Sequence, residues 1–157
     1  MRFLACLLLL VCLAATARAE TLSGVVIVVI DGDTVLFKPD HYAPQSRAFL
    51  KLRLAGIDAP EATQPGGEAA TRALSQLALK RRATFDGRAS DRYGRRVGWL
   101  AVGDLDASAH LAEQGLAWAS RDAPSALRRR VESAREARRG LWVDPEPMPP
   151  WVWRRMQ

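Results

Sequence analysis

Residues 21–37 read TLSGVVIVVIDGDTVLF, and this stretch decides how the fold begins. The run Thr21–Ile30 is rich in Val and Ile, which favour strands, and a second β-branched and aromatic run follows at Thr34–Phe37. Between the two runs stands Asp31-Gly32-Asp33, a sequence typical of turns. The stretch therefore predicts a β-hairpin.

The elements expected after this hairpin are short and mixed. Apolar, β-branched and aromatic residues predict further strands at residues 49–54, 83–85 and 97–102. Helical spacing of apolar residues predicts helices at residues 68–82, 108–116 and 125–139. Gly140 is expected in the position that follows the end of the last helix. Five short strands and three helices indicate an α+β fold around a small barrel.

The first nineteen residues predict a secretory signal peptide. Arg2 precedes the apolar run Phe3–Ala15, and Ala17-Arg18-Ala19 supplies an A-x-A cleavage site. The apolar run is too short for a transmembrane helix, which needs about twenty residues. We therefore expect a secreted or periplasmic protein, cleaved near Ala19, without stable membrane insertion.

Cleavage there would also change what chemistry the chain can use. It would remove both cysteines, Cys6 and Cys12, so the exported protein would have no disulfide and no cysteine-based metal site. Residues 20–144 are then expected to form the domain. Residues 145–157, which are rich in Pro, Trp and Arg, are expected to form a tail outside the core.

The composition is that of a globular protein with a basic surplus. Hydrophobic residues make up 48% of the 157 residues, charged residues make up 25%, and the formal net charge is +6. Twenty of the 23 basic residues are arginines, whose guanidinium fork binds two phosphate oxygens at once. This excess favours nucleic acid as a partner, although a basic surface also serves solubility.

Three polar clusters carry the candidate chemistry, and each has a purely structural alternative. Residues 31–34, DGDT, offer two carboxylates to a hard cation, but Asp-Gly is also a common hairpin turn. Residues 53–61, RLAGIDAPE, set one arginine and two acids at the end of a strand, as a phosphodiester site or a surface salt bridge. Residues 91–96, DRYGRR, suit a phosphate and a base, or form a charged surface turn.

Taken in this order, the three clusters resemble those of the staphylococcal nuclease (thermonuclease) family. The resemblance runs from about Val25 to Trp142, with further matching blocks at residues 111–117 and 134–142. It implies an OB-fold, that is, a five-stranded β-barrel with three helices. It also implies Ca²⁺-dependent hydrolysis of DNA and RNA that leaves a 3′-phosphate. Single-stranded DNA and RNA are the expected substrates, and we expect a monomer.

The resemblance implies a calcium site built from two of the clusters. Asp33 and Asp58 would bind Ca²⁺ through their carboxylates, and Ala59 would bind it through its backbone carbonyl. The family usually has Thr where this chain has Ala59, but a main-chain ligand survives that change. Asp31 and Thr34 would support the metal ligands and a water molecule from behind.

The same resemblance implies the residues that act on the phosphodiester. Glu61 would be the catalytic carboxylate that takes a proton from the attacking water. Arg53 and Arg95 would be the catalytic arginines that stabilise negative charge on the phosphate. Arg92 and Tyr93 would bind the substrate by lining the nucleotide site.

Two departures from the family pattern bear on substrate binding. Where the family often has a tyrosine near the nucleotide base, this chain continues into Trp118, so base stacking is expected to be weaker or to be supplied by Trp118. Ser108 stands where the family commonly has Asn, which puts the anchoring of a nearby loop in question.

Two other functions remain open. An OB-fold that binds single strands without cutting them would use Arg92, Arg95 and an aromatic ring, but would have no use for the three acids. The second is a membrane-surface role for the arginines of residues 128–139 and for the tail, which competes with a solvated helix face. The presence of Asp33, Asp58 and Glu61 favours the enzyme.

Overall fold

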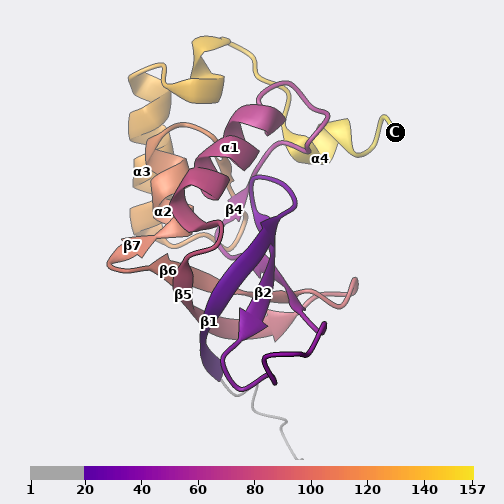
Figure 1. Ribbon diagram of the computed structural model, residues 1–157. Helices are drawn as coiled ribbons and strands as arrows, with labels where there is room; N and C mark the ends of the chain where they lie inside the picture. Colours follow the sequence, from indigo (N-terminus) through magenta and orange to yellow (C-terminus); the bar gives the residue numbers. More distant parts are fainter. Residues whose placement is uncertain (1–19) are drawn as a thin grey trace, which may run out of the picture.

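The hairpin predicted around Asp31–Asp33 is present and forms the first part of a closed barrel (Figure 1). The computed structural model describes residues 20–157, so the expected signal peptide lies outside the described part of the chain. The five strands of the barrel are β1 (Glu20–Val29), β2 (Thr34–Pro39), β3 (Leu50–Leu54), β5 (Arg82–Ser90) and β6 (Arg96–Val102).

Strand pairing closes this sheet on itself. Neighbouring strands run antiparallel in the order β3-β2-β1-β5-β6, and a parallel pairing of β3 with β6 joins the two ends. The predicted α+β fold with a five-stranded OB-type barrel is thereby confirmed. A short strand, β7 (Leu105–Asp106), pairs antiparallel with the end of β6. Strand β4 (Ile57–Asp58) pairs with β8 (Trp118–Ala119) outside the barrel.

The three predicted helices are also present, and they gather over one end of the barrel (Figure 1). The central helix α2 packs against both α1 and α3, and α1 also contacts β1. The bounds of the helices are α1 (Gly67–Ala78), α2 (Ala107–Glu113) and α3 (Ser125–Glu136), followed by the 3₁₀ turn η1 (Gly140–Val143) and the short helix α4 (Pro150–Trp153).

All three predicted helices end three or more residues early, α2 at Glu113 instead of residue 116, while β5 runs on to Ser90 instead of residue 85. Helix α1 stops at Ala78 instead of residue 82, because Lys80 turns to a φ of 60° and donates its N–H to the Val26 carbonyl at 2.8 Å. Helix α3 stops at Glu136, and Arg138 rather than Gly140 takes the left-handed position after it, with a φ of 51°. Both ends are set by contacts that the local sequence pattern does not contain.

The core joins the barrel to the helices. Among its largest fully buried side chains are Phe37 and Phe85 in the barrel and Leu74 and Leu111 in the helices. Burying an aliphatic or aromatic side chain of this size contributes about 1.5–3 kcal/mol. The core therefore holds the helices firmly on the barrel, and the loops between them form a stable platform.

The tail expected outside the core packs against the domain instead. Pro150 is buried, and the Trp151 ring meets Trp118 edge-on, with ring centroids 6.3 Å apart. Trp118 itself is buried between Trp142 and Trp151, so the expectation that it stacks on a base was wrong. Within residues 20–157, no helix combines the length and apolar character that crossing a membrane requires.

The question raised by Ser108 has a structural answer. Its buried hydroxyl donates a hydrogen bond of 2.8 Å to the carbonyl of Ala55, in the turn between β3 and β4. Helix α2 is thereby tied to the chain segment that leads from Arg53 to Asp58. A serine at this position therefore anchors the loop.

Candidate functional site

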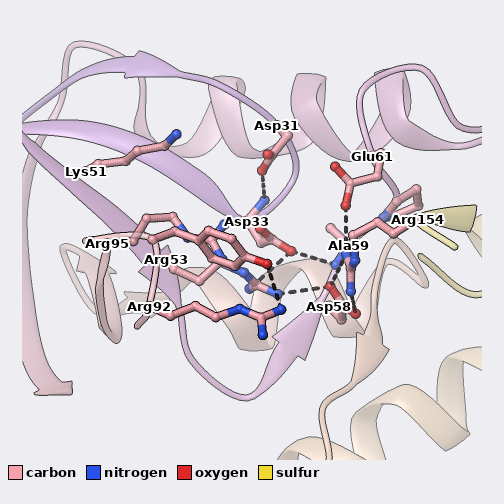
Figure 2. A pocket seen from close by; sticks show the side chains of 12 residues that line it. Asp31, Asp33, Lys51, Arg53, Asp58, Ala59, Glu61, Arg92, Arg95 and Arg154 are labelled. Atoms are coloured by element: carbon pink, nitrogen blue, oxygen red, sulfur yellow. Dashed lines mark hydrogen bonds and ion pairs between the residues drawn. The ribbon is translucent and has the colours of Figure 1, made fainter. Parts of the chain in front are cut away.

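The predicted site residues converge on one polar pocket of about 430 Å³ (Figure 2). The β1–β2 turn, strand β3, the segment after β4, the β5–β6 turn and the C-terminal tail all contribute to its wall. The lining residues are Asp31, Asp33, Lys51, Arg53, Asp58, Ala59, Pro60, Glu61, Arg92, Tyr93, Arg95 and Arg154. Of the ten predicted site residues, only Thr34 is absent from this lining, and its hydroxyl contacts Asp33 from behind.

The β1–β2 turn is held against the rest of the site by its glycine. A Cβ atom at Gly32 would lie 2.6 Å from the Cβ of Ala70 in α1 and 2.7 Å from that of Ala59. Only a residue without a side chain allows so close an approach. Asp31 shapes the turn further, because its Oδ1 accepts a hydrogen bond of 3.0 Å from the Asp33 N–H. The turn thus brings Asp33 to the segment that carries Asp58.

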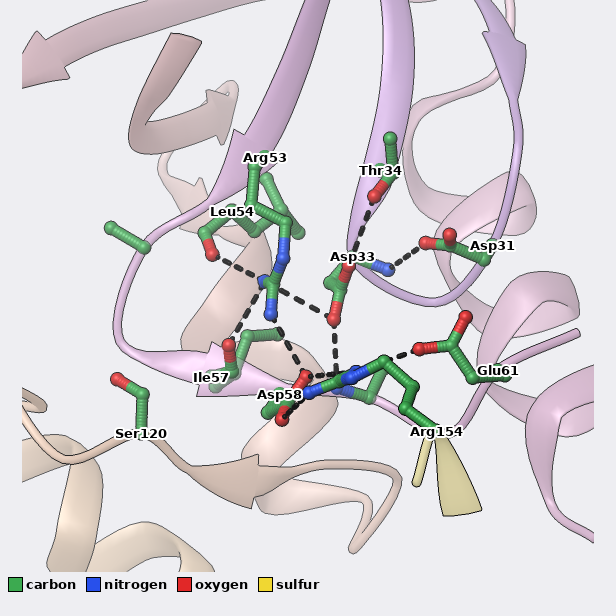
Figure 3. A network of polar contacts seen from close by, with 12 residues as sticks. Asp31, Asp33, Thr34, Arg53, Leu54, Ile57, Asp58, Glu61, Ser120 and Arg154 are labelled. Carbon is green, nitrogen blue, oxygen red and sulfur yellow. Dashed lines mark hydrogen bonds and ion pairs between the residues drawn. The ribbon is translucent and has the colours of Figure 1, made fainter. Parts of the chain in front are cut away.

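Asp33 is buried, and both of its carboxylate oxygens have polar contacts (Figure 3). Its Oδ2 accepts the Ala59 N–H at 2.8 Å and lies 3.1 Å from the Arg53 Nη1, while its Oδ1 accepts the Thr34 hydroxyl at 3.0 Å. Burial raises the pKa of Asp33 to about 7; the guanidinium of Arg53 and the Ala59 N–H oppose this rise, and the neighbouring carboxylates of Asp31 and Asp58 add to it. A bound cation would stabilise the charged form of Asp33 and so oppose this rise in its pKa.

Arg53 connects the two predicted carboxylate ligands of the metal, Asp33 and Asp58. Its Nη1 donates to the carbonyls of Leu54 and Ile57 at 2.8 and 2.9 Å, and its Nη2 donates to the Asp58 Oδ1 at 3.0 Å (Figure 3). Gly56, with a φ of 78°, makes the turn that folds Ile57 back to this guanidinium. The salt bridge considered at sequence level is therefore real, but it is largely buried and anchored to the backbone.

Glu61 stands at the edge of the pocket, and its backbone is held by the loop that follows it. The buried side chain of Gln64 accepts the Glu61 N–H at 3.2 Å, and the Gln64 N–H donates to the Glu61 carbonyl at 2.9 Å. The carboxylate itself is 36% exposed, and its Oε1 accepts a hydrogen bond of 2.7 Å from the Arg154 Nη1. Glu61 is thus within reach of both solvent and the pocket.

The β5–β6 turn supplies the other arginines. The Nε of Arg95 donates to Asp91 at 2.7 Å, and the Arg95 guanidinium lies 5.6 Å from the centre of the Tyr93 ring. Arg92 lies 4.9 Å over the same ring and donates to the Tyr93 hydroxyl at 2.7 Å. The pKa of Asp91 is lowered, because hydrogen bonds from Arg95 and Tyr93 outweigh desolvation, which acts in the opposite direction. The Asp91 carboxylate thus aims Arg95 at the pocket.

The donor set suits a hard cation. Asp33 and Asp58 present carboxylate oxygens and Ala59 a backbone carbonyl, the ligand type that Ca²⁺ prefers when water completes its shell. Within residues 20–157, no three Asp, Glu, His or Cys side chains cluster closely enough to enclose a metal on their own. These residues fit an open site that leaves coordination positions to water and a ligand.

Three contributors to the site were not predicted: Lys51, Gln64 and Arg154. Lys51 comes two residues before Arg53, and the alternation of a strand places both side chains on the same face. This signal was present in the sequence. Gln64 and Arg154 carried none, because their roles depend on how the loop after Glu61 and the tail pack together.

Comparison with known proteins agrees with this arrangement. The family described as staphylococcal nuclease homologue matches residues 51–144. Protein ParB of Escherichia coli is 37% identical over 155 residues, which cover 90% of this chain and 84% of that protein. An uncharacterized endonuclease of Escherichia coli O157:H7 is 34% identical, with 83% of this chain and 84% of that protein covered. Micrococcal nuclease of Shigella flexneri is 32% identical, with 84% and 80% covered. The chain belongs to the staphylococcal nuclease homologue family.

Proposed function

We propose that this protein is a Ca²⁺-dependent nuclease that hydrolyses phosphodiester bonds of DNA and RNA and leaves 3′-phosphate products. The family, together with relatives named endonuclease and micrococcal nuclease, makes it a hydrolytic nuclease. One observation supports the finer proposal most strongly. Asp33, Asp58 and Glu61 share a single pocket with Arg53 and Arg95, so acids and phosphate-binding groups face the same space.

In this proposal the two aspartates and the Ala59 carbonyl hold the cation. When bound, Ca²⁺ would offset the negative charge that builds up on the phosphate. Arg53 is already fixed by Asp33, Asp58 and two carbonyls, so it needs little reorganisation to donate to a phosphate oxygen. Removing one such preorganised donor from an enzyme typically costs about 3–4 kcal/mol of barrier.

Glu61 is the proposed proton acceptor. It takes a proton from a water molecule as the water oxygen bonds to phosphorus. The bond between phosphorus and the 5′ oxygen breaks, and that oxygen takes up a proton from solvent. The products are a 3′-phosphate on one fragment and a 5′-hydroxyl on the other. Arg95 and Arg53 stabilise the charge on the phosphate throughout.

Substrate binding falls to the β5–β6 turn. Tyr93 is 68% exposed, and its ring offers a stacking surface beside two guanidinium groups. A single strand presents both of its recognisable features here, because phosphates pair with Arg92 and Arg95 while a base packs on the ring. Since every base has a flat aromatic face that can stack on the ring, single-stranded DNA and RNA are both accepted in this proposal.

The proposal extends to export and to oligomeric state. The protein is secreted or periplasmic after cleavage near Ala19, on the strength of the apolar run and A-x-A site in the sequence. We also propose that it works as a monomer, because one chain by itself supplies the acids and arginines that the proposed chemistry uses. Determining the N-terminal residue of the exported protein tests the first point, and its mass in solution tests the second.

The central test is hydrolysis of single-stranded DNA and RNA by residues 20–157 with Ca²⁺, with EDTA and with a Glu61→Gln variant. We expect cutting that EDTA abolishes and that Glu61→Gln slows by about 100- to 10,000-fold, the usual contribution of a general base. Product masses should show 3′-phosphates. The matched control is Glu68→Gln, an exposed glutamate on α1 paired with Arg72 outside the pocket, which should leave the rate unchanged. Tight binding without cutting under any cation would refute the enzyme and favour a binding module.

A further inference from the structure

The C-terminal segment, residues 145–157, lies against the domain (Figure 1), and its Arg154 lines the pocket. Gln64, buried under the Glu61 loop, donates its Nε2 to the Met148 carbonyl at 2.6 Å. Pro150 is buried, and the ring of Trp151 packs edge-on against Trp118. These anchors come from the loop after Glu61 and from β8, which pairs with the strand that carries Asp58. The tail is therefore attached to the same elements that hold the proposed catalytic acids.

The docked tail delivers one guanidinium into the acid cluster (Figures 2 and 3). Arg154 follows α4, and its Nη2 lies 2.8 Å from the Asp58 Oδ2. Its Nη1 donates to the Asp58 Oδ1 at 3.2 Å and to the Glu61 Oε1 at 2.7 Å. The pKa of Arg154 is raised above its ordinary value by the hydrogen bonds to Asp58, against desolvation, and by those to Glu61. Arg154 is thus a fixed positive charge at this point.

This contact occupies the oxygens that the proposed chemistry needs. Asp58 Oδ1 accepts from both Arg53 and Arg154, and Asp58 Oδ2 accepts from Arg154. A cation that binds Asp58 therefore meets a guanidinium already bonded to both oxygens, and the two positive charges compete for the same carboxylate. The same guanidinium bonds to Glu61, so it also stabilises the carboxylate that is meant to accept a proton.

We infer that the C-terminal segment is a built-in competitor of the divalent cation, in which Arg154 holds Asp58 and Glu61 until cation binding displaces it. This inference rests on the proposed function for the presence of the cation. The arrangement is reversible, because the Arg154 side chain is 47% exposed and can swing into solvent without disturbing the barrel core. The domain thereby raises the cation concentration at which its acids become available.

The experiment is calorimetric titration of residues 20–157 with Ca²⁺ alone, with no substrate present. We expect Arg154→Ala to bind Ca²⁺ about fivefold more tightly than the unchanged protein, the ratio for a partly exposed ion pair at the upper end of the usual range. Arg155→Ala is the matched control, because it removes the same charge one residue later and the Arg155 side chain donates to the Trp151 carbonyl instead of to the acids. Trp151→Ala loosens the tail without changing any charge and should shift the affinity in the same direction by a smaller factor.

Three results would overturn the inference. Equal Ca²⁺ affinities for Arg154→Ala and Arg155→Ala would show that the contact with Asp58 does not compete with the cation. An unchanged affinity together with weaker binding of a short oligonucleotide would make Arg154 a phosphate ligand instead. If the unchanged protein and every variant failed to bind Ca²⁺, the proposed calcium dependence would fall as well, which separates that failure from the first two.

Discussion

The pocket has a floor, formed by Asp33, Arg53 and Asp58, and a rim, formed by Arg92, Tyr93 and Arg154. The side chains of the floor are 7–15% exposed, and several of their bonds run to backbone groups of the barrel and of β4. The rim residues bond mainly to other side chains, with Arg154 47% and Tyr93 68% exposed. The floor is therefore positioned by the fold, and the rim is positioned by its neighbours.

The difference in burial determines how strongly the charges of the floor and of the rim interact. Charges at the floor lie in a less polar medium, where electrostatic interactions are stronger than in water. Ion pairs at the rim are screened by solvent and contribute about 0–1 kcal/mol. Changes at the floor should thus alter both chemistry and stability, while changes at the rim should alter binding alone.

Among changes that compare the floor with the rim, the largest effect is expected at Arg53. Arg53→Lys keeps the charge but loses the planar fork that bonds to Leu54, Ile57 and Asp58 together. We expect kcat on single-stranded DNA to fall by about 100- to 1,000-fold, in line with the loss of one preorganised donor. The matched control is Arg82→Lys, which alters an exposed pair with Asp40 away from the pocket and should leave kcat unchanged. Retention of near-normal kcat by Arg53→Lys would mean that charge alone suffices at the floor.

The next largest effect concerns stability and its dependence on pH at Asp33. Because burial raises the pKa of Asp33 to about 7, the folded state holds this proton more tightly than the unfolded chain. Its contribution to stability is present at low pH and is lost as pH rises from about 4 to about 7. Asp33→Asn removes that loss. In EDTA, the free energy of unfolding of Asp33→Asn relative to the unchanged protein should rise by about 1–3 kcal/mol between pH 5 and pH 8.

Urea unfolding at the two pH values measures this difference. Asp104→Asn, at an exposed aspartate before β7, controls for the loss of one negative charge and should show no such rise. A relative stability of Asp33→Asn that stays constant with pH would contradict the burial argument. Added Ca²⁺ should stabilise the unchanged protein more than Asp33→Asn, since only the former keeps both proposed carboxylate ligands.

The floor could be predicted from the sequence, because its residues lie in short motifs whose backbone shape is local. Asp33 sits in the turn of a hairpin, and Arg53 and Asp58 lie five positions apart around a single glycine turn. The barrel could be predicted as well, since the runs of β-branched and aromatic residues within 21–37 favour strands that have to pair. What the motifs could not give is the pairing of β4 with β8, which are only two residues each.

The docking of residues 145–157 could not be predicted either, because it too depends on contacts between residues far apart in the sequence. Arg154 meets Glu61 across 93 positions of sequence, so no local pattern connects the two. The four prolines of residues 145–157 leave room for only one short helix there, α4. The tryptophans of the same segment were the better signal, because a ring as large as that of Trp151 gains from packing on another one.

The smallest effect is expected at Tyr93, which tests whether a residue of the rim affects substrate binding alone. Tyr93→Ala should raise KM for single-stranded DNA by about 3- to 10-fold through lost base stacking, and change the free energy of unfolding by less than about 0.5 kcal/mol. Tyr93→Phe separates ring from hydroxyl, since it loses only the bond from Arg92 and should behave like the unchanged protein. Tyr42→Ala, at the chain's other tyrosine, is the control. Steady-state kinetics measures KM and kcat separately. A large fall in kcat for Tyr93→Ala would mean that the rim positions the reacting phosphate, and the division between floor and rim would be wrong.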